Sequence, residues 1–130
     1  MRQYGVSAVT NLENGDEMLF VYGTLMNPAE RVILLGRPID ASPGRLPGYV
    51  RGRKRHYFVA EQAGAFTDGA ILEGLSAREL AILDEYEEVP ALYTRERIEV
   101  LAVDGRKIEC WIYLPTSWAK VSQGEKLESQ

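Results

Sequence analysis

Residues 18–25 read MLFVYGTL, an apolar and aromatic run that ends directly in glycine. This pattern predicts a β-strand over Met18–Tyr22 and a sharp turn at Gly23. A strand that ends in a glycine turn before a helix presents consecutive backbone N–H groups to an anion. An ordinary strand-to-helix turn can have the same sequence, so this segment alone is only a weak indication of a binding site.

A second informative segment lies about sixty residues further on, where residues 83–87 read LDEYE. Upstream, Ser76 and Glu79 have the spacing of a capping box, which predicts the start of a helix. Pro90 predicts the end of that helix, near residue 87 or 88. The second segment therefore forms the last turns of a short helix.

One face of this helix is apolar and carries an acid near its end. Leu80, Leu83, Asp84 and Glu87 recur at helical spacing, so Glu87 projects on the face that meets the core. Burial raises the pKa of a carboxyl group, and the negative end of the helix dipole acts in the same direction. A carboxylate of this kind can exchange protons near neutral pH.

Two alternatives remain open from geometry alone. If the helix ends one residue earlier, Glu87 faces solvent, and Asp84 competes for the role because it shares the apolar stripe. We expect Arg78, Glu79, Glu85 and Glu88 to point to the other sides of the helix.

The remaining elements predict an α+β fold with a largely antiparallel sheet or barrel. Asn27 and Pro28 predict the start of a short buried helix over residues 28–35, which Gly36 ends. We expect turns over residues 37–48, one or two strands over 49–61, and a strand over 70–75 that begins after Asp68-Gly69. Asp104-Gly105 predicts a hairpin between strands over 93–103 and 107–114. We expect an N-terminal extension over residues 1–17, one domain over 18–115 and a polar tail over 116–130.

The composition limits the classes of function. The chain has 130 residues, 45% hydrophobic and 26% charged, with a net charge of −4, which places it in the soluble globular class. Cys110 is the single cysteine and His56 the single histidine, so we expect no disulfide within the chain, no Cys–His catalytic pair and no transition-metal site. We find neither a secretory signal nor a membrane-spanning run, and we expect a cytoplasmic protein.

A local excess of basic residues could form a nucleic-acid patch. The residues are Arg45, Arg51, Arg53, Lys54 and Arg55. Few aromatic residues are interleaved with them and the chain as a whole is acidic, so a solvated strand or loop face is the preferred interpretation. We expect no nucleic-acid partner.

Taken together, the motifs resemble those of the γ-glutamylcyclotransferase-like family, and most closely its AIG2-like branch. The resemblance extends over residues 18–115 and rests on Phe20–Met26, Leu34–Arg37, Leu46–Tyr49, Gly74–Ser76 with Glu79 and Leu80, Leu83–Glu87, and Tyr93–Arg95. The first of these motifs and the Leu-Asp-x-aromatic-Glu motif are far more specific together than either is alone.

The resemblance implies a mixed, mostly antiparallel β-barrel flanked by short helices, with a cavity for a γ-glutamyl group. It implies that the turn after the first strand binds the substrate through Tyr22, Gly23, Thr24 and Leu25. It also implies that the catalytic residue is Glu87 rather than Asp84. Tyr93 matches a tyrosine near the pocket, although a strand tyrosine packed in the core fits equally well. Arg95 matches too, and it could simply pair with the acidic residues 84–88.

The implied reaction converts a γ-glutamyl amine or peptide to 5-oxoproline and a free amine, with a glutamate as general base and without a metal or cofactor. The alternative is a non-catalytic AIG2-like module that binds a small molecule or a protein. Residues 56–60 lack the proline that relatives often have there, which leaves that wall of the pocket and the leaving amine open. We expect no membrane partner, and the sequence leaves the oligomeric state open.

Overall fold

The computed structural model describes residues 15–53 and 57–117. In chain order its elements are β1 (Glu17–Val21), η1 (Thr24–Met26), α2 (Pro28–Leu35), β2 (Ala41–Arg53), β3 (Tyr57–Leu75), α3 (Ala77–Tyr86), β4 (Tyr93–Ala102) and β5 (Lys107–Pro115). Over these described residues, the five strands close into a barrel in the order β1-β3-β2-β4-β5. Neighbouring strands are antiparallel except β1 and β5, which pair in parallel where Leu19 faces Trp111. The predicted α+β class with a mostly antiparallel barrel is confirmed.

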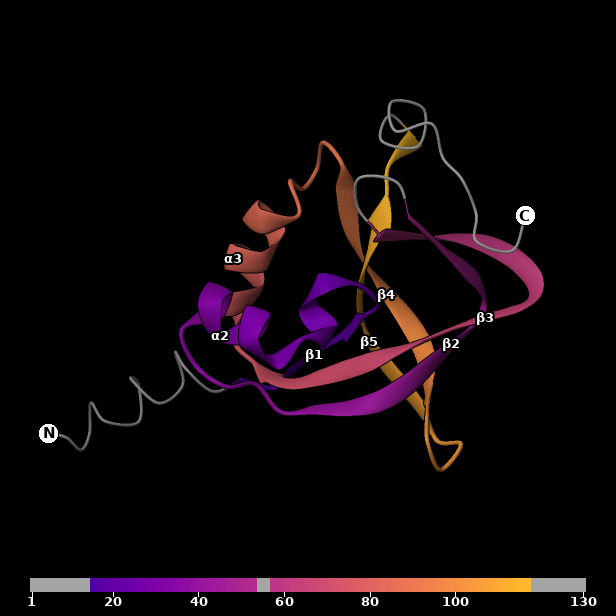
Figure 1. Ribbon diagram of the computed structural model, residues 1–130, viewed down its shortest axis with the longest axis horizontal. Coiled ribbons are helices and arrows are strands. Elements are labelled where there is room, and N and C mark those ends of the chain that lie inside the picture. The colour runs from indigo at the N-terminus through magenta and orange to yellow at the C-terminus, as the bar shows by residue number, and fades with distance from the viewer. Residues whose placement is uncertain (1–14, 54–56, 118–130) are drawn as a thin grey trace, which may run out of the picture.

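Strand β1 separates two groups of core side chains. Successive side chains of a strand point to opposite faces. Leu19 and Val21 accordingly pack with side chains of α3 such as Leu83, whereas Phe20 and Tyr22 pack with strand residues of the barrel. In Figure 1, α2 and α3 lie next to each other on one side of the barrel. The end of β1 therefore lies where the helices meet the barrel.

Helix α2 begins and ends where the sequence predicts. The side chain of Asn27 accepts a hydrogen bond from the Ala29 N–H at 2.9 Å, and Gly36 ends the helix with a left-handed φ of 78°. The prediction of a buried helix is wrong, because Val32 and Ile33 are 43% and 72% exposed. This short helix lies on the outside of the barrel and can bury only one side.

The prediction of turns over residues 37–48 and a new strand after Asp68-Gly69 is also wrong. Strand β2 already begins at Ala41, and β3 continues through Asp68 and Gly69. The two strands pair from Ala41↔Leu72 to Arg53↔Tyr57, with an irregularity between Pro47 and Tyr49. This long-range pairing overrides the local turn preference of proline and glycine.

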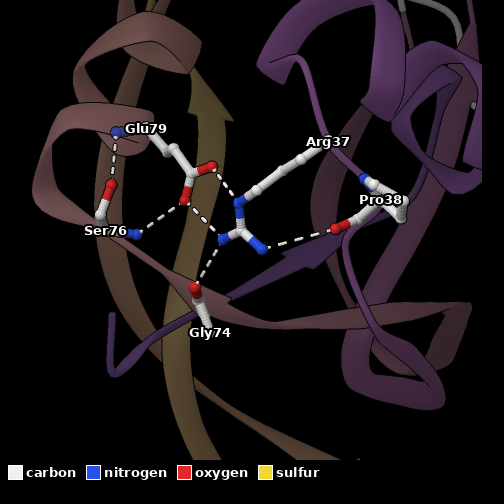
Figure 2. A network of polar contacts seen from close by, with 5 residues as sticks. All are labelled: Arg37, Pro38, Gly74, Ser76 and Glu79. Carbon is white, nitrogen blue, oxygen red and sulfur yellow. Dashed lines mark hydrogen bonds and ion pairs between the residues drawn. The ribbon is translucent and has the colours of Figure 1, made fainter. Parts of the chain in front are cut away.

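The capping box of α3 is confirmed, and it is part of a larger network (Figure 2). Glu79 is 5% exposed, so the prediction that it points away from the core is wrong. Its carboxylate accepts hydrogen bonds from Arg37 Nε at 2.7 Å and Nη2 at 2.8 Å, and from the Ser76 N–H at 3.0 Å. Arg37 Nη2 also donates to the Gly74 carbonyl at 2.9 Å. Burial raises the pKa of Glu79, but these donors outweigh burial and hold it below its usual value.

The predicted hairpin between β4 and β5 is confirmed, with Gly105 at a left-handed φ of 87°. Neither α2 nor α3, nor any other helix within residues 15–53 and 57–117, is long and apolar enough to cross a membrane.

Candidate active site

A cavity of about 180 Å³ lies where the end of β1, the end of α3 and the barrel wall meet. Its lining comes from three parts of the chain: residues 20–25, residues 86–88, and a wall formed by Arg53, Tyr57, Leu92, Tyr93 and Tyr113. The volume is smaller than the roughly 300–1,000 Å³ of sites for drug-sized ligands. The cavity therefore fits a group of amino-acid size.

The structure brings together all the residues that the sequence indicated for this site. Tyr22, Gly23, Thr24 and Leu25 line the cavity together with Glu87 and Tyr93. In the turn, the Met26 N–H donates to the Gly23 carbonyl at 3.0 Å and the Asn27 N–H to the Thr24 carbonyl at 3.1 Å. The preceding N–H groups, at residues 23–25, take no part in these two bonds, as is usual at the start of a helix.

Gly23 is required by a close approach. A Cβ atom at this position would lie 2.9 Å from Cβ and Cδ2 of Tyr57, closer than real Cβ contacts. The Tyr57 ring therefore packs directly against the turn. Tyr57 is held in turn by Tyr93, whose hydroxyl donates to the Tyr57 carbonyl at 2.7 Å.

Glu87 is the C-terminal cap of α3, and its N–H donates to the Leu83 carbonyl at 2.8 Å. Glu88 then adopts a left-handed φ of 58°. Its N–H donates to the Glu85 carbonyl at 3.1 Å, and the Val89 N–H donates to the Asp84 carbonyl at 2.9 Å. These last two bonds are those of a Schellman helix end, with glutamate where glycine is usual. The chain turns away after Glu87 and leaves its side chain at the cavity.

Burial raises the pKa of Glu87 from 4.5 to about 7. Tyrosines surround the carboxylate: burial raises the pKa of Tyr22, Tyr93 and Tyr113, and the charge of Glu87 adds to each shift. Glu85 and Glu88 are exposed, as predicted. Glu87 is thus an acid that changes protonation state near neutral pH.

Asp84, the competing carboxylate, has a different environment. It accepts hydrogen bonds from Arg95 Nε at 2.7 Å and Nη2 at 3.1 Å, and from the Tyr113 hydroxyl at 2.7 Å. Burial raises its pKa, but these donors outweigh burial and hold it below its usual value. Asp84 therefore stays ionised and does not suit proton exchange. The expected pairing of Arg95 with residues 84–88 is present in this contact.

Several residues of the wall were not predicted from the sequence, among them Arg53, Tyr86 and Tyr113. Arg53 and Tyr113 lie on strands that only the folded barrel brings next to α3, whereas Tyr86 lies directly before Glu87 in the chain. Tyr57 lies in the segment 56–60, which the resemblance places at the pocket wall. For Tyr113, the sequence contained a signal. Side chains of a strand alternate between its two faces, so Cys110 and Ile112, which lie in the core, leave Tyr113 on the other face of β5.

The basic cluster is dispersed rather than assembled into one patch. Arg45 pairs with Asp68 at 2.8 Å, and Arg51 donates to the Tyr22 carbonyl at 3.2 Å. Arg53 lies over the Tyr57 ring, 4.8 Å from its centre. The remaining basic residues of the cluster, at 54 and 55, and the histidine at 56 lie outside the described residues.

Comparison with known proteins agrees with this architecture. The family model described as gamma-glutamyl cyclotransferase, AIG2-like, matches residues 19–130. A Methanocaldococcus jannaschii protein, named as a gamma-glutamylcyclotransferase and a proposed RNase, is 32% identical over 105 residues, which cover 78% of this chain and 47% of that protein. Human gamma-glutamylaminecyclotransferase is 26% identical, with 87% of this chain and 90% of that protein covered. The solution structure of an Arabidopsis thaliana protein superposes with a TM-score of 0.74 at 22% identity, covering 86% of this chain and 76% of that one.

The barrel with its two helices is thus of the class of the gamma-glutamyl cyclotransferases. The chain belongs to the gamma-glutamyl cyclotransferase, AIG2-like family. It spans about half the length of the first curated relatives, 47% of the archaeal protein and 51% of AIG2-like protein C of Arabidopsis thaliana.

Proposed function

We propose that the protein converts a γ-glutamyl amine or peptide to 5-oxoproline and a free amine. One observation carries the proposal: Glu87, with its pKa raised to about 7, lines the same cavity as the turn over residues 22–25. Membership of the family and the name of the human relative support the same class of reaction.

The reaction is intramolecular. The α-amino nitrogen of the glutamyl group attacks the γ-carbonyl carbon, a C–N bond forms to close the five-membered lactam, and the C–N bond to the leaving amine breaks. Because both reacting groups belong to one molecule, the protein supplies mainly orientation and proton transfer. No metal or organic cofactor is needed for these steps.

Glu87 is the proposed general base. In its ionised form it takes a proton from the α-ammonium group and later returns it to the nitrogen of the leaving amine. A group with a pKa near the working pH does both steps well. The pKa of Asp84 is held too low for the second step.

The turn and the tyrosines form the proposed binding surface. The N–H groups of Gly23, Thr24 and Leu25 hold the α-carboxylate of the substrate, as backbone donors at a sharp turn can. Tyr22 and Tyr93 close the cavity around the glutamyl chain, since both are buried and both line it.

The test is a panel of γ-glutamyl amines, γ-glutamyl peptides and Nε-(γ-glutamyl)lysine, with release of 5-oxoproline as the readout. Glu87→Gln keeps the size and most of the hydrogen bonding of the side chain but removes proton transfer. We expect kcat to fall roughly 10²–10⁴-fold, the span of positioned acid–base catalysis.

Two other outcomes separate the alternatives. Thermal stabilisation by a γ-glutamyl amine without release of 5-oxoproline favours a non-catalytic binding module. Full activity of Glu87→Gln, with Asp84→Asn folded but inactive, assigns the base to Asp84 instead.

A further inference from the structure

Asp84 joins three elements close to Glu87. It lies on α3, three residues before Glu87, which caps the end of this helix. Its carboxylate is bound by Arg95 of β4 at 2.7 and 3.1 Å and by the hydroxyl of Tyr113 of β5 at 2.7 Å. The contact therefore fixes α3 against the β4–β5 hairpin.

Tyr113 connects this contact to the cavity. The residue is 4% exposed, it lines the cavity beside Glu87, and the charge of Glu87 contributes to its raised pKa. Its carbonyl accepts a hydrogen bond from the Tyr22 hydroxyl at 2.5 Å. Tyr113 thus contacts Asp84 through its hydroxyl and Tyr22, just before the turn, through its backbone.

We propose that Asp84 is a positioning residue for Glu87. It holds the end of α3 and Tyr113 in register with the 22–25 turn, so that the Glu87 carboxylate faces the glutamyl group. The inference rests on the proposed function, because it takes Glu87 to be the proton carrier. A misplacement of about 1 Å can lower a rate roughly 10²-fold, so loss of this contact would reduce turnover without any change in Glu87 itself.

The chain offers a matched control for an ion pair that has no such role. Arg45 binds Asp68 through the same two atoms, Nε at 2.8 Å and Nη2 at 3.2 Å. The Arg45–Asp68 pair is more exposed, with side-chain exposures of 50% and 63% against 23% and 27% for Arg95 and Asp84. Neither Arg45 nor Asp68 lines the cavity that contains Glu87.

The experiment compares Asp84→Asn, Tyr113→Phe and Asp68→Asn with the wild-type chain on one accepted γ-glutamyl amine. We expect kcat to fall about 10- to 100-fold in the first two variants, with KM changed less than about threefold because the turn is intact. Asp68→Asn should match the wild type. Tyr113→Phe removes one hydroxyl and leaves the Arg95–Asp84 pair, so it covers the case in which Asp84→Asn does not fold.

A double variant distinguishes positioning from a general loss of structure. If Asp84 acts through Glu87, adding Asp84→Asn to Glu87→Gln should lower kcat less than about threefold further, because residues that act as a unit are not additive. Losses that multiply in the double variant, or wild-type kcat in Asp84→Asn, would overturn the inference.

A second readout keeps the inference separate from the proposed function. If the wild-type protein releases no 5-oxoproline from any substrate in the panel, the proposed function fails. A crystal structure of Tyr113→Phe or Asp84→Asn then decides the positioning: a Glu87 carboxylate displaced from the Gly23 turn supports it, and an unchanged position refutes it.

Discussion

At the scale of single residues, the site depends on a carboxylate that burial has made weakly acidic. Burial raises the pKa of Glu87, whereas the carboxylate of Asp84, in the preceding turn, is bound by Arg95. Two acids on one helix face therefore have opposite pKa shifts. Pairs of this kind separate an acid–base role from a structural role.

The raised pKa of Glu87 predicts a pH-dependent effect on stability. The folded state favours the protonated acid, so the stability that Glu87 contributes is fully present below the unfolded pKa near 4.5 and is lost as the pH rises through about 7. We expect Glu87→Gln to raise the free energy of unfolding at pH 8 by up to about 3 kcal/mol, with the difference vanishing near pH 4. Urea unfolding at both pH values measures this, and a variant equally stable or less stable at pH 8 contradicts it.

Gly23 gives a prediction based on packing. In Gly23→Ala the new methyl group would lie 2.9 Å from Tyr57, so either the turn or the ring must move. We expect a loss of about 1–3 kcal/mol in the free energy of unfolding and weaker binding of γ-glutamyl ligands. Thermal unfolding with and without ligand checks both effects, and wild-type values in both would show that the close approach is not needed.

At the scale of elements, α3 is fixed at both ends. The Arg37–Glu79 network in Figure 2 holds its start against the segment after α2 and against the end of β3. The Asp84 contact and the helix end at Glu88 hold its last turns. The direction of this helix decides where Glu87 lies relative to the 22–25 turn.

Removal of Arg37 tests the first of these attachments. Arg37→Met leaves the Glu79 carboxylate, whose side chain is 6% exposed, without its main donor. Breaking a buried pair in this way costs about 3 kcal/mol, whereas Arg45→Met breaks an exposed pair and should cost less than about 1 kcal/mol. Chemical denaturation of the two variants gives the comparison, and equal losses would show that burial of Glu79 has no energetic effect.

Glu88 gives a prediction with the opposite sign. Its φ of 58° is left-handed, a conformation that glycine adopts without strain. Glu88→Gly should therefore raise the free energy of unfolding by about 0.5–1 kcal/mol. A lower melting temperature would mean that the Glu88 side chain stabilises the cavity more than its backbone strains it.

At the scale of the whole molecule, the locally encoded parts of the fold could be predicted from the sequence. The cap at Asn27, the capping box at Ser76 and the hairpin at Asp104-Gly105 each depend on residues a few positions apart. The early start of β2 and the length of β3 could not be predicted, because Ala41 pairs with Leu72 only in the folded barrel.

The candidate site divides in the same way. Helical spacing placed Glu87 on the apolar face, but spacing alone could not decide between it and Asp84. The family resemblance favoured Glu87. The contacts that hold the pKa of Asp84 low support the same choice, and they come from Arg95 and Tyr113, on strands that follow α3 in the chain. The resemblance placed residues 56–60 at the pocket wall, but the contact of Tyr57 with Gly23 could not be predicted, because the two residues are far apart in the sequence.

The closed barrel has one long strand pair, β2 with β3, and one short strand pair, β2 with β4, which we call the ladder and the seam. This difference in length predicts a difference in local stability. Strands β2 and β3 pair along almost their whole length, whereas β2 and β4 pair, within the described residues, only at Gly44↔Ala102 and Arg45↔Leu101. Amides that open only with the barrel core exchange slowest.

Within Leu46–Arg53, we therefore expect alternate amides to differ: those that face β3 should exchange slowly, and those that face β4 at least about tenfold faster. Hydrogen exchange followed by NMR measures this pattern. Uniform protection along Leu46–Arg53 would show instead that the seam is as tightly closed as the ladder.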